Sequence, residues 1–377
     1  MTILICIPCL LIGGTELQTL SLVRALVRRA HRVVAACYFE HNPDIVNRYR
    51  SAGSEVELFS PQGERKTGSN CALFLYSKLR ECVLKYHPDV AHVQYMAPGA
   101  LPCLLLRLLG VQRIIATAHT DARIYRSRSL RMLRFICKHV TDVFTCITTR
   151  AEEEFFGISS RFTPEHRLAR HSHTTLYNAL PAHVQLATAP RTELPASPVI
   201  GVVGRMEGIK GMELVLPAFA LLLKEMPHVR LLVVGDGSLT PLMKSQAAQL
   251  GVANSVEWVG RQSPEELSTY YDRLSLLWMP SLSEGFGLSA LEAMARACPV
   301  VASRVGGLPE LVEAGECGEL CEPGDVPSLA AVTLRILQDE ERWKKLSRGA
   351  LNQAEQFSNE RYEELTAHLY KQVLCMR

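Results

Sequence analysis

Short apolar runs alternate along the chain with longer stretches in which apolar and polar positions repeat with a helical period. This alternation is typical of βαβ units, in which helices join the parallel strands of a buried sheet. In the first half of the chain the pattern predicts six strands, at residues 2–8, 32–39, 56–60, 89–94, 113–119 and 142–148. Helices are predicted between them, for example at residues 16–30 and 70–86.

The same alternation begins again in the second half of the chain. It predicts five further strands, at residues 199–205, 229–237, 255–260, 274–281 and 299–303. Helices are predicted between them, at residues 212–226, 239–250 and 264–274. The segment that separates the two halves, residues 186–198, is rich in Pro, Ala and Thr and has no apolar period, which is typical of a linker.

Two successive patterns of this kind predict an α/β protein with two Rossmann-like, doubly wound domains. The N-terminal domain is predicted at residues 1–185, the linker at 186–198 and the C-terminal domain at 199–360. Residues 361–377 predict a terminal helix that can pack back on the N-terminal domain. Ligands of such sheets bind at the carboxyl ends of the strands, so two such edges could face one another across a cleft.

The overall composition adds little to this prediction, but the distribution of charged residues along the chain is informative. Hydrophobic residues make up 47% and charged residues 21% of the 377 residues, which is ordinary for a soluble globular protein. Residues 1–180 contain 23 Lys and Arg against 14 Asp and Glu, whereas the rest of the chain contains 18 against 24. A basic N-terminal half favours an anionic acceptor or an anionic membrane surface. The alternative is that the two halves merely balance.

The twelve cysteines are scattered through apolar contexts. Cys6 and Cys9 form a C-x-x-C, but no second pair lies at zinc spacing, so buried reduced thiols of a cytoplasmic protein are expected. No His, Cys and Asp cluster has metal spacing, and no metal or cofactor is predicted. The apolar N-terminal segment lacks a basic n-region and a cleavage pattern, and no apolar run is long enough to span a bilayer. We expect a cytoplasmic protein, with the inner face of the membrane as a candidate surface.

A first candidate site lies in "GVVGRMEGIKG", residues 201–211. A buried strand ends at Gly204, and Arg205 and Lys210 follow around a glycine-containing loop that opens a helix. Two cations at a helix N-terminus suit a diphosphate, because the free N–H groups and the helix dipole favour anions. The alternative interpretation is two exposed surface cations.

A second candidate site is "EGFGLSALE", residues 284–292, which follows a predicted strand. Its glycines let the backbone approach a ligand, and the N–H groups at the start of the next helix would point at a phosphate or sugar. The second glutamate lies one turn into that helix, where a carboxylate can accept both hydroxyls of a ribose. An exposed acid that stabilises the helix dipole is the alternative. The candidate ligand-binding residues are Glu284, Gly285, Phe286, Gly287, Leu288, Ser289 and Glu292.

The first half of the chain contributes weaker signals. Gly13 and Gly14 occupy the first βα turn but do not complete a G-x-G-x-x-G fingerprint, so a nicotinamide oxidoreductase is disfavoured. His92 and His119 lie near the ends of predicted strands, where a ligand cleft would open. His119 is a candidate to touch a transferred group or polarise a neighbouring oxygen, whereas His92 is more typical of a structural histidine.

Residues 123–139 read as a basic amphipathic helix. Such a helix can lie on anionic lipid, although a solvated basic face is the more usual outcome. The segment lacks the aromatic interleaving and the recognised motifs of nucleic-acid binding, so no nucleic-acid partner is predicted. Its basic residues are Arg123, Arg126, Arg128, Arg131, Arg134 and Lys138.

Taken together, these motifs resemble the retaining glycosyltransferases of family four, whose two-Rossmann architecture is called GT-B. The resemblance extends along almost the whole chain and is most specific in the second half. There "GRMEGIKG", "VVGDGSL", "EGFGLSALEAMARACPVVAS" and "GGLPELV" follow in the family's order and spacing. "TTLYNALP" is similar to the Asn-containing stretch that precedes the family's linker, whereas Ser289 stands where many relatives have proline.

The resemblance implies a role for each candidate residue. Arg205 and Lys210 would clamp the diphosphate of the donor, Glu292 would bind the nucleotide ribose, and Glu284 with its loop would hold the donor sugar. His119 would contact that sugar near the reacting centre. Five glycines in the turns after predicted strands, and one aspartate among them, would also bind the donor. These residues are Gly13, Gly14, Gly204, Gly235, Asp236 and Gly237. The family needs no metal, and the nucleotide sugar is a substrate rather than a cofactor.

The implied reaction is transfer of a sugar from a nucleoside-diphosphate donor to a saccharide or lipid-linked acceptor, with retention of anomeric configuration. Departure of the diphosphate develops negative charge, which the cations at 205 and 210 and the helix N-terminus are placed to stabilise. Two alternatives stay open at this point. One is a two-Rossmann sugar-nucleotide epimerase or phosphorylase, and the other is a non-catalytic protein that binds a sugar nucleotide.

Overall fold

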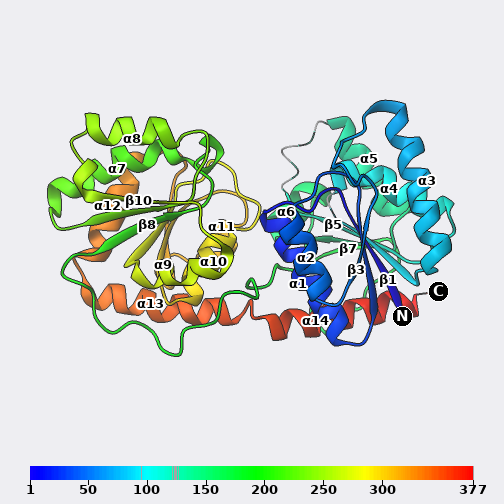
Figure 1. Cartoon of the computed structure of the whole chain (residues 1–377). Helices are drawn as coiled ribbons and strands as arrows, with labels where there is room; N and C mark the ends of the chain where they lie inside the picture. Colours follow the sequence, from blue (N-terminus) through cyan, green and yellow to red (C-terminus); the bar gives the residue numbers. More distant parts are fainter. Residues whose placement is uncertain (95, 121, 123–124, 126, 377) are drawn as a thin grey trace. The chain divides into compact units, whose positions relative to one another are not determined.

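The computed structural model of the chain describes residues 1–94, 96–120, 122, 125 and 127–376, with side chains for all of these except 69 and 96–99. The chain forms two compact units. The first consists of Met1–Ala179 together with Asn359–Arg377, and the second of Leu180–Ser358. Each unit is built on one parallel sheet with helices on both faces (Figure 1).

The sheet of the first unit has seven strands in the order β3-β2-β1-β4-β5-β6-β7, and neighbouring strands are parallel. Six of them correspond to the predicted apolar runs. β7 was not predicted, because its sequence Ser-His-Thr-Thr contains no apolar residue. The strands are β1 (Thr2–Ile7), β2 (Arg32–Cys37), β3 (Glu55–Leu58), β4 (Val90–Gln94), β5 (Ile114–Ala118), β6 (Val143–Cys146) and β7 (Ser172–Thr175).

Successive side chains of the first sheet pack on opposite faces, as the period of a strand requires. In β1, Ile3 and Ile5 join the core beneath one set of helices, whereas Leu4 and Cys6 join the core on the other face. The first set is α1 (Gly14–Arg28), α2 (Pro43–Ser51) and α14 (Asn359–Cys375). The second set is α3 (Gly68–Tyr86), α4 (Met96–Leu108) and α5 (Ser127–His139), and α6 (Thr149–Phe156) follows β6. The last helix of the chain therefore completes the core of the first unit.

The sheet of the second unit has six strands in the order β10-β9-β8-β11-β12-β13, again parallel. Five correspond to predicted strands, and β13 was not predicted because its short sequence Gly-Glu-Leu-Cys has no apolar run. The strand order reverses between β8 and β11, and the loops after two such strands are where doubly wound sheets bind ligands. The strands are β8 (Val199–Val203), β9 (Arg230–Val234), β10 (Val256–Gly260), β11 (Leu276–Met279), β12 (Val300–Ser303) and β13 (Gly318–Cys321).

Helices cover both faces of the second sheet (Figure 1). One face carries α7 (Met212–Glu225), α8 (Thr240–Gln249) and α12 (Val326–Leu337), and the other carries α9 (Leu267–Arg273), α10 (Leu288–Ala295) and α13 (Glu340–Glu355). A short helix, α11 (Leu308–Leu311), follows β12. Residues 186–198 lie in this unit, where the Arg191 guanidinium donates to the carbonyls of Tyr271 and Arg296.

All twelve cysteines are free thiols. Within the part of the chain that the structure describes, no helix combines the length and the apolar character needed to cross a bilayer. The described side chains also contain no group of three or more His, Cys, Asp and Glu that could hold a metal ion.

Candidate functional site

The loops that follow β8 and β11 are joined to each other at the point where the strand order reverses. The backbone N–H of Leu282 donates to the carbonyl of Ile209 at 3.0 Å. Gly211 has a positive φ of 66°, and a Cβ at this position would lie 1.9 Å from the carbonyl oxygen of Pro280. A side chain at 211 would therefore push the two loops apart, so this glycine is required by close approach as well as by its backbone conformation.

This contact brings together two of the predicted site residues. The Lys210 ammonium donates to Glu284 Oε2 at 2.6 Å, and both side chains are partly buried. An ammonium has three donors, so Lys210 can hold Glu284 and still bind a phosphate oxygen. Arg205 lies exposed on the same loop, after β8. The sequence predicted a cation and a carboxylate at this edge of the sheet, and the structure pairs them.

The loop after β9 packs on the loop after β8 just as closely. A Cβ on Gly235, which has a φ of 128°, would lie 1.8 Å from the carbonyl oxygen of Gly204. A Cβ on Gly237 would lie 2.5 Å from the carbonyl oxygen of Met206. Asp236 accepts from the Gly237 N–H at 2.8 Å and from the Thr240 hydroxyl at 2.7 Å, and these hydrogen bonds lower the pKa of its carboxyl. The Asp236 carboxylate thus holds its own turn together.

The glycine turn before α10 is supported from the loop after β12. A Cβ on Gly306 would lie 1.6 Å from the carbonyl oxygen of Glu284, and the Gly307 N–H donates to the Gly285 carbonyl at 3.2 Å. Gly287, with a φ of 103°, stands at the N-cap of α10. Phe286 is 3% exposed and packs edge-to-face on Phe357, so its side chain belongs to the core and only its backbone is available to a ligand.

Glu292 lies one turn into α10, as predicted, but it is not an exposed acid at a helix start. It is only 5% exposed, its Oε2 accepts from the Tyr271 hydroxyl at 2.7 Å, and the His183 Nε2 lies 3.7 Å from its Oε1. Burial raises the pKa of Glu292 to about 7, and the hydrogen bond from Tyr271 opposes that rise. The interpretation as a surface residue that stabilises the helix dipole is therefore wrong. Tyr271 and His183 were not singled out by the sequence, because neither belongs to a motif.

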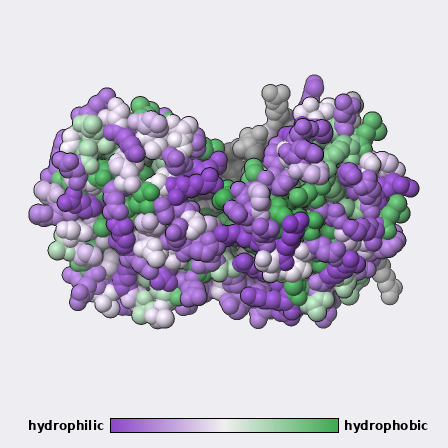
Figure 2. All heavy atoms as spheres, in the orientation of Figure 1, coloured by the Kyte–Doolittle hydropathy of each residue, from purple (hydrophilic) through white to green (hydrophobic). Residues whose placement is uncertain are grey.

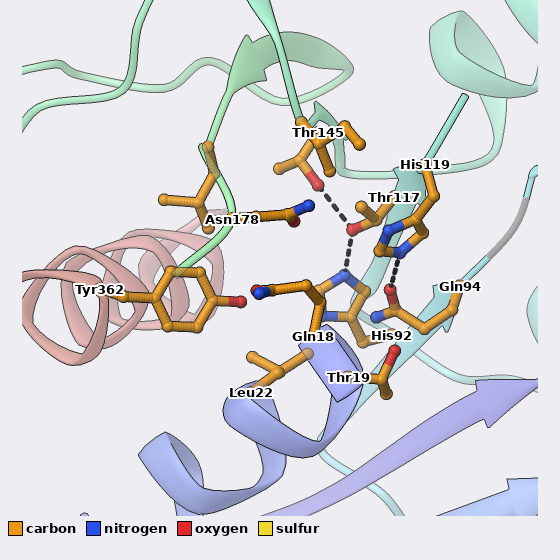
Figure 3. A pocket seen from close by; sticks show the side chains of 12 residues that line it. Gln18, Thr19, Leu22, His92, Gln94, Thr117, His119, Thr145, Asn178 and Tyr362 are labelled. Carbon is orange, nitrogen blue, oxygen red and sulfur yellow. Dashed lines mark hydrogen bonds between the residues drawn. The ribbon is translucent and has the colours of Figure 1, made fainter. Parts of the chain in front are cut away.

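The first unit places His119 at a cavity of about 20 Å³ at the carboxyl ends of β4, β5 and β6 (Figure 3). His119 Nε2 and Gln94 Oε1 are 2.7 Å apart. An amide oxygen only accepts, so His119 donates through Nε2. Burial lowers the pKa of His119 to about 3. The ring is thus neutral at physiological pH, where it can form hydrogen bonds but carries no positive charge.

His92 faces the same cavity in a different role. Its Nδ1 lies 2.7 Å from the Tyr370 hydroxyl. Its Nε2 lies 2.6 Å from the Thr117 hydroxyl, which in turn contacts Thr145 (Figure 3). Burial lowers the pKa of His92 to about 3. Both ring nitrogens are hydrogen-bonded within the fold, which is the environment of a structural histidine.

The first βα turn of this unit is built from Gly13, the N-cap of α1, and Gly14, its first residue. The Cys9 thiol lies 3.3 Å from Glu16 Oε1, and burial together with this carboxylate raises its pKa to about 12. Burial also raises the pKa of Cys6 to about 12. Both cysteines of the C-x-x-C are therefore protonated thiols at physiological pH, which disfavours a redox pair.

The basic segment forms α5 from Ser127 onward, whereas Arg123 and Arg126 lie outside the described residues. Leu133, Ile136 and Cys137 face the core. The exposed side of the helix carries four cations and two large apolar side chains, Arg128, Arg131, Arg134, Lys138, Met132 and Phe135. Figure 2 shows hydrophobic side chains at the surface of the first unit in the region of α3, α4 and α5.

Two parallel-sheet domains, with the Lys210–Glu284 ion pair and close-packed glycine loops where the second sheet reverses its order, are the architecture of the GT-B class of glycosyltransferases. Comparisons with known proteins agree. Residues 12–158 match Glycosyltransferase Family 4, and residues 189–353 match Glycosyl transferases group 1. The chain belongs to glycosyltransferase family 4 and is a glycosyltransferase.

Individual relatives support the same assignment. The chain is 31% identical to a D-inositol 3-phosphate glycosyltransferase of Segniliparus rotundus over 77% of its own length and 68% of that protein. It is 29% identical to an N-acetyl-alpha-D-glucosaminyl L-malate synthase of Bacillus anthracis, over 80% and 79% of the two chains. Among solved structures, Anabaena HepE in complex with UDP matches with a TM-score of 0.79 at 19% identity, covering 98% of this chain and 100% of that one.

Proposed function

We propose that the second unit binds a nucleoside-diphosphate sugar and that the enzyme transfers this sugar to a saccharide or lipid-linked acceptor. The observation that carries the proposal is the Lys210–Glu284 pair at the strand reversal, with the exposed Arg205 on the same loop as Lys210 and the N-terminus of α10 just after Glu284. A leaving diphosphate develops negative charge, and preorganised cations and N–H groups at this edge would stabilise it. The proposal rests both on the positive charge of these side chains and on their position at the ligand-binding edge of the sheet.

Within this site we assign the side chains as follows. Arg205 and Lys210 bind the diphosphate, Glu284 binds the donor sugar, and Glu292 binds the nucleotide ribose. Gly204, Gly235, Gly237, Gly285 and Gly287 with Asp236 shape the loops, and the N–H groups at Leu288 and Ser289 face the ligand. In the first unit, Gly13 and Gly14 contribute to donor binding, and the neutral His119 contacts the donor sugar near the reacting carbon.

We further propose that transfer retains the anomeric configuration and uses no metal. Glu284 is held in an ion pair with Lys210, so it is suited to bind hydroxyls and poorly suited to attack the sugar as a glycosidase nucleophile would. An oxygen of the donor phosphate can instead take the proton of the acceptor as it attacks from the same face. Two side-chain cations supply the positive charge for which other transferases use a divalent ion.

Mass-spectrometric screening of UDP-, GDP- and ADP-sugars tests the donor proposal. UDP-sugars come first, because HepE was crystallised with UDP. We expect one nucleotide series to bind and to be hydrolysed slowly without acceptor, yielding the free sugar and a nucleoside diphosphate. Recovery of an isomerised sugar nucleotide would favour an epimerase, and binding without turnover across a broad acceptor library would favour a non-catalytic protein.

We also propose that α5 brings the cytoplasmic enzyme to the inner face of an anionic membrane. Its exposed cations flank Met132, 47% exposed, and Phe135, 55% exposed. The protein should then sediment with vesicles that contain anionic lipid, detach in high salt, and ignore neutral vesicles. Reversing two charges with Arg131→Glu and Lys138→Glu should abolish sedimentation, whereas Arg80→Glu on α3 should leave it intact. Equal recovery with neutral vesicles would rule the surface out.

A further inference from the structure

Tyr271 is a buried residue whose hydroxyl points at Glu292, the carboxylate proposed to bind the ribose. It lies on α9, which packs against α10, and it is fully buried. Its hydroxyl donates to Glu292 Oε2 at 2.7 Å. Burial and the neighbouring carboxylate raise the pKa of Tyr271 well above its usual value, so it remains a hydrogen-bond donor at every physiological pH. Its neighbour Tyr270 lies partly exposed beneath the Arg273 guanidinium instead.

The groups around Glu292 come from each element that packs on α10. Tyr271 faces it from α9, and its hydroxyl also interacts with the Ser289 side chain in the first turn of α10. His183 approaches the other oxygen of Glu292 to 3.7 Å, and Cys298 lies near the tyrosine just after the helix. The buried side chains of α13 are uncharged ones such as Trp343 and Ser347, and β11 and β12 contribute apolar side chains. The Asp272–Arg296 pair lies at the C-terminal end of α10.

We propose that Tyr271 is a positioning residue for the nucleotide: its hydroxyl fixes one oxygen of Glu292, so that the carboxylate is oriented and ionised for two neighbouring ribose hydroxyls. The inference rests on the proposed function, since it concerns the same donor site. A carboxylate offers about four lone pairs, and Tyr271 uses one of them. Two vicinal hydroxyls then find two acceptors. A protonated carboxyl offers fewer acceptors and carries no charge, so it would bind the ribose more weakly.

The hydroxyl of Tyr271 opposes the rise in the pKa of Glu292 that burial causes. Desolvation disfavours the charged carboxylate, whereas a hydrogen bond donated to that carboxylate favours it. Without the hydroxyl, Glu292 would stay protonated to a higher pH, and its Oε2 would lose the hydrogen bond that fixes its orientation. Both changes weaken the same contact. A purely structural tyrosine would instead affect folding and would not distinguish one nucleotide from another.

Binding of UDP and of 2′-deoxy-UDP, measured by calorimetry from pH 6 to 9, tests this role. The wild-type chain should prefer UDP about tenfold, the order expected for one hydrogen bond to a charged group. Tyr271→Phe, which keeps the ring, should reduce that preference to about twofold and move its pH midpoint upward. Tyr270→Phe is the matched control and should behave as wild type. If UDP does not bind, GDP and ADP with their 2′-deoxy forms replace it.

The 2′-deoxy nucleotide is an internal standard, because a misfolded variant would lose both ligands equally. An unchanged preference and an unchanged pH midpoint in Tyr271→Phe would overturn the inference while leaving the donor site in place. Failure of the wild-type chain to bind any of the three nucleoside diphosphates would overturn the donor site itself, and this inference with it.

Discussion

Lys210→Ala should lower kcat for sugar transfer by roughly 10²- to 10³-fold, the effect of removing one preorganised donor from a developing anion. The substitution removes a cation from the proposed diphosphate site and leaves Glu284 without its partner at 2.6 Å. The donor KM should rise as well, because the diphosphate is charged already in the ground state. Steady-state kinetics with the donor found by screening measure both effects.

Lys224→Ala supplies the control for this prediction. Lys224 is exposed near the C-terminal end of α7, the helix that follows the Lys210 loop, and its removal should change neither parameter. Arg205→Ala should act in the same direction as Lys210→Ala. If both variants at the proposed diphosphate site kept wild-type donor affinity and turnover, Arg205 and Lys210 would be ordinary surface cations and the donor site would lie elsewhere.

Glu292→Gln should make the second unit more stable above pH 7 while weakening its binding of the donor. Burial raises the pKa of Glu292 from 4.5 to about 7, so the folded protein holds this proton more tightly than the unfolded chain does. The contribution of the protonated Glu292 to the free energy of unfolding is therefore fully present below pH 4.5. It is lost as the pH rises through 7. The amide has no proton to lose. The variant should therefore be more stable than wild type by about 3 kcal/mol at pH 8 and nearly equal at pH 4.

Urea denaturation of the two proteins at both pH values measures this difference. Glu213→Gln, at an exposed carboxylate on α7, is the control and should give no pH-dependent gain. A Glu292→Gln variant that was less stable than wild type at pH 8 would show that the carboxylate is a structural contact. A gain in stability with a loss of UDP binding is the expected result, since residues kept for function often cost stability.

Much of this site follows from position in the sequence. Arg205 and Lys210 come directly after one buried strand and Glu284 after another, and the carboxyl ends of parallel strands meet at one sheet edge. The pairing of His119 with Gln94 follows the same reasoning, because β4 and β5 are neighbours and both residues stand at their ends.

The rest depends on packing that no local pattern reveals. Tyr271 lies 21 positions before Glu292 in an ordinary amphipathic helix, and only the contact of α9 with α10 brings them together. The support that Gly306 gives to the Glu284 turn is similar, because a glycine in a loop does not show which backbone it approaches. β7 and β13 were not predicted, because a polar or very short strand lacks the apolar run that identifies the other strands.

A crystal structure of the chain with UDP would test the central claim most directly. The account predicts diphosphate oxygens within hydrogen-bonding distance of Arg205 and Lys210, and both ribose hydroxyls on the carboxylate of Glu292. A nucleotide bound away from the loops after β8 and β11, or a diphosphate that touches neither cation, would contradict it.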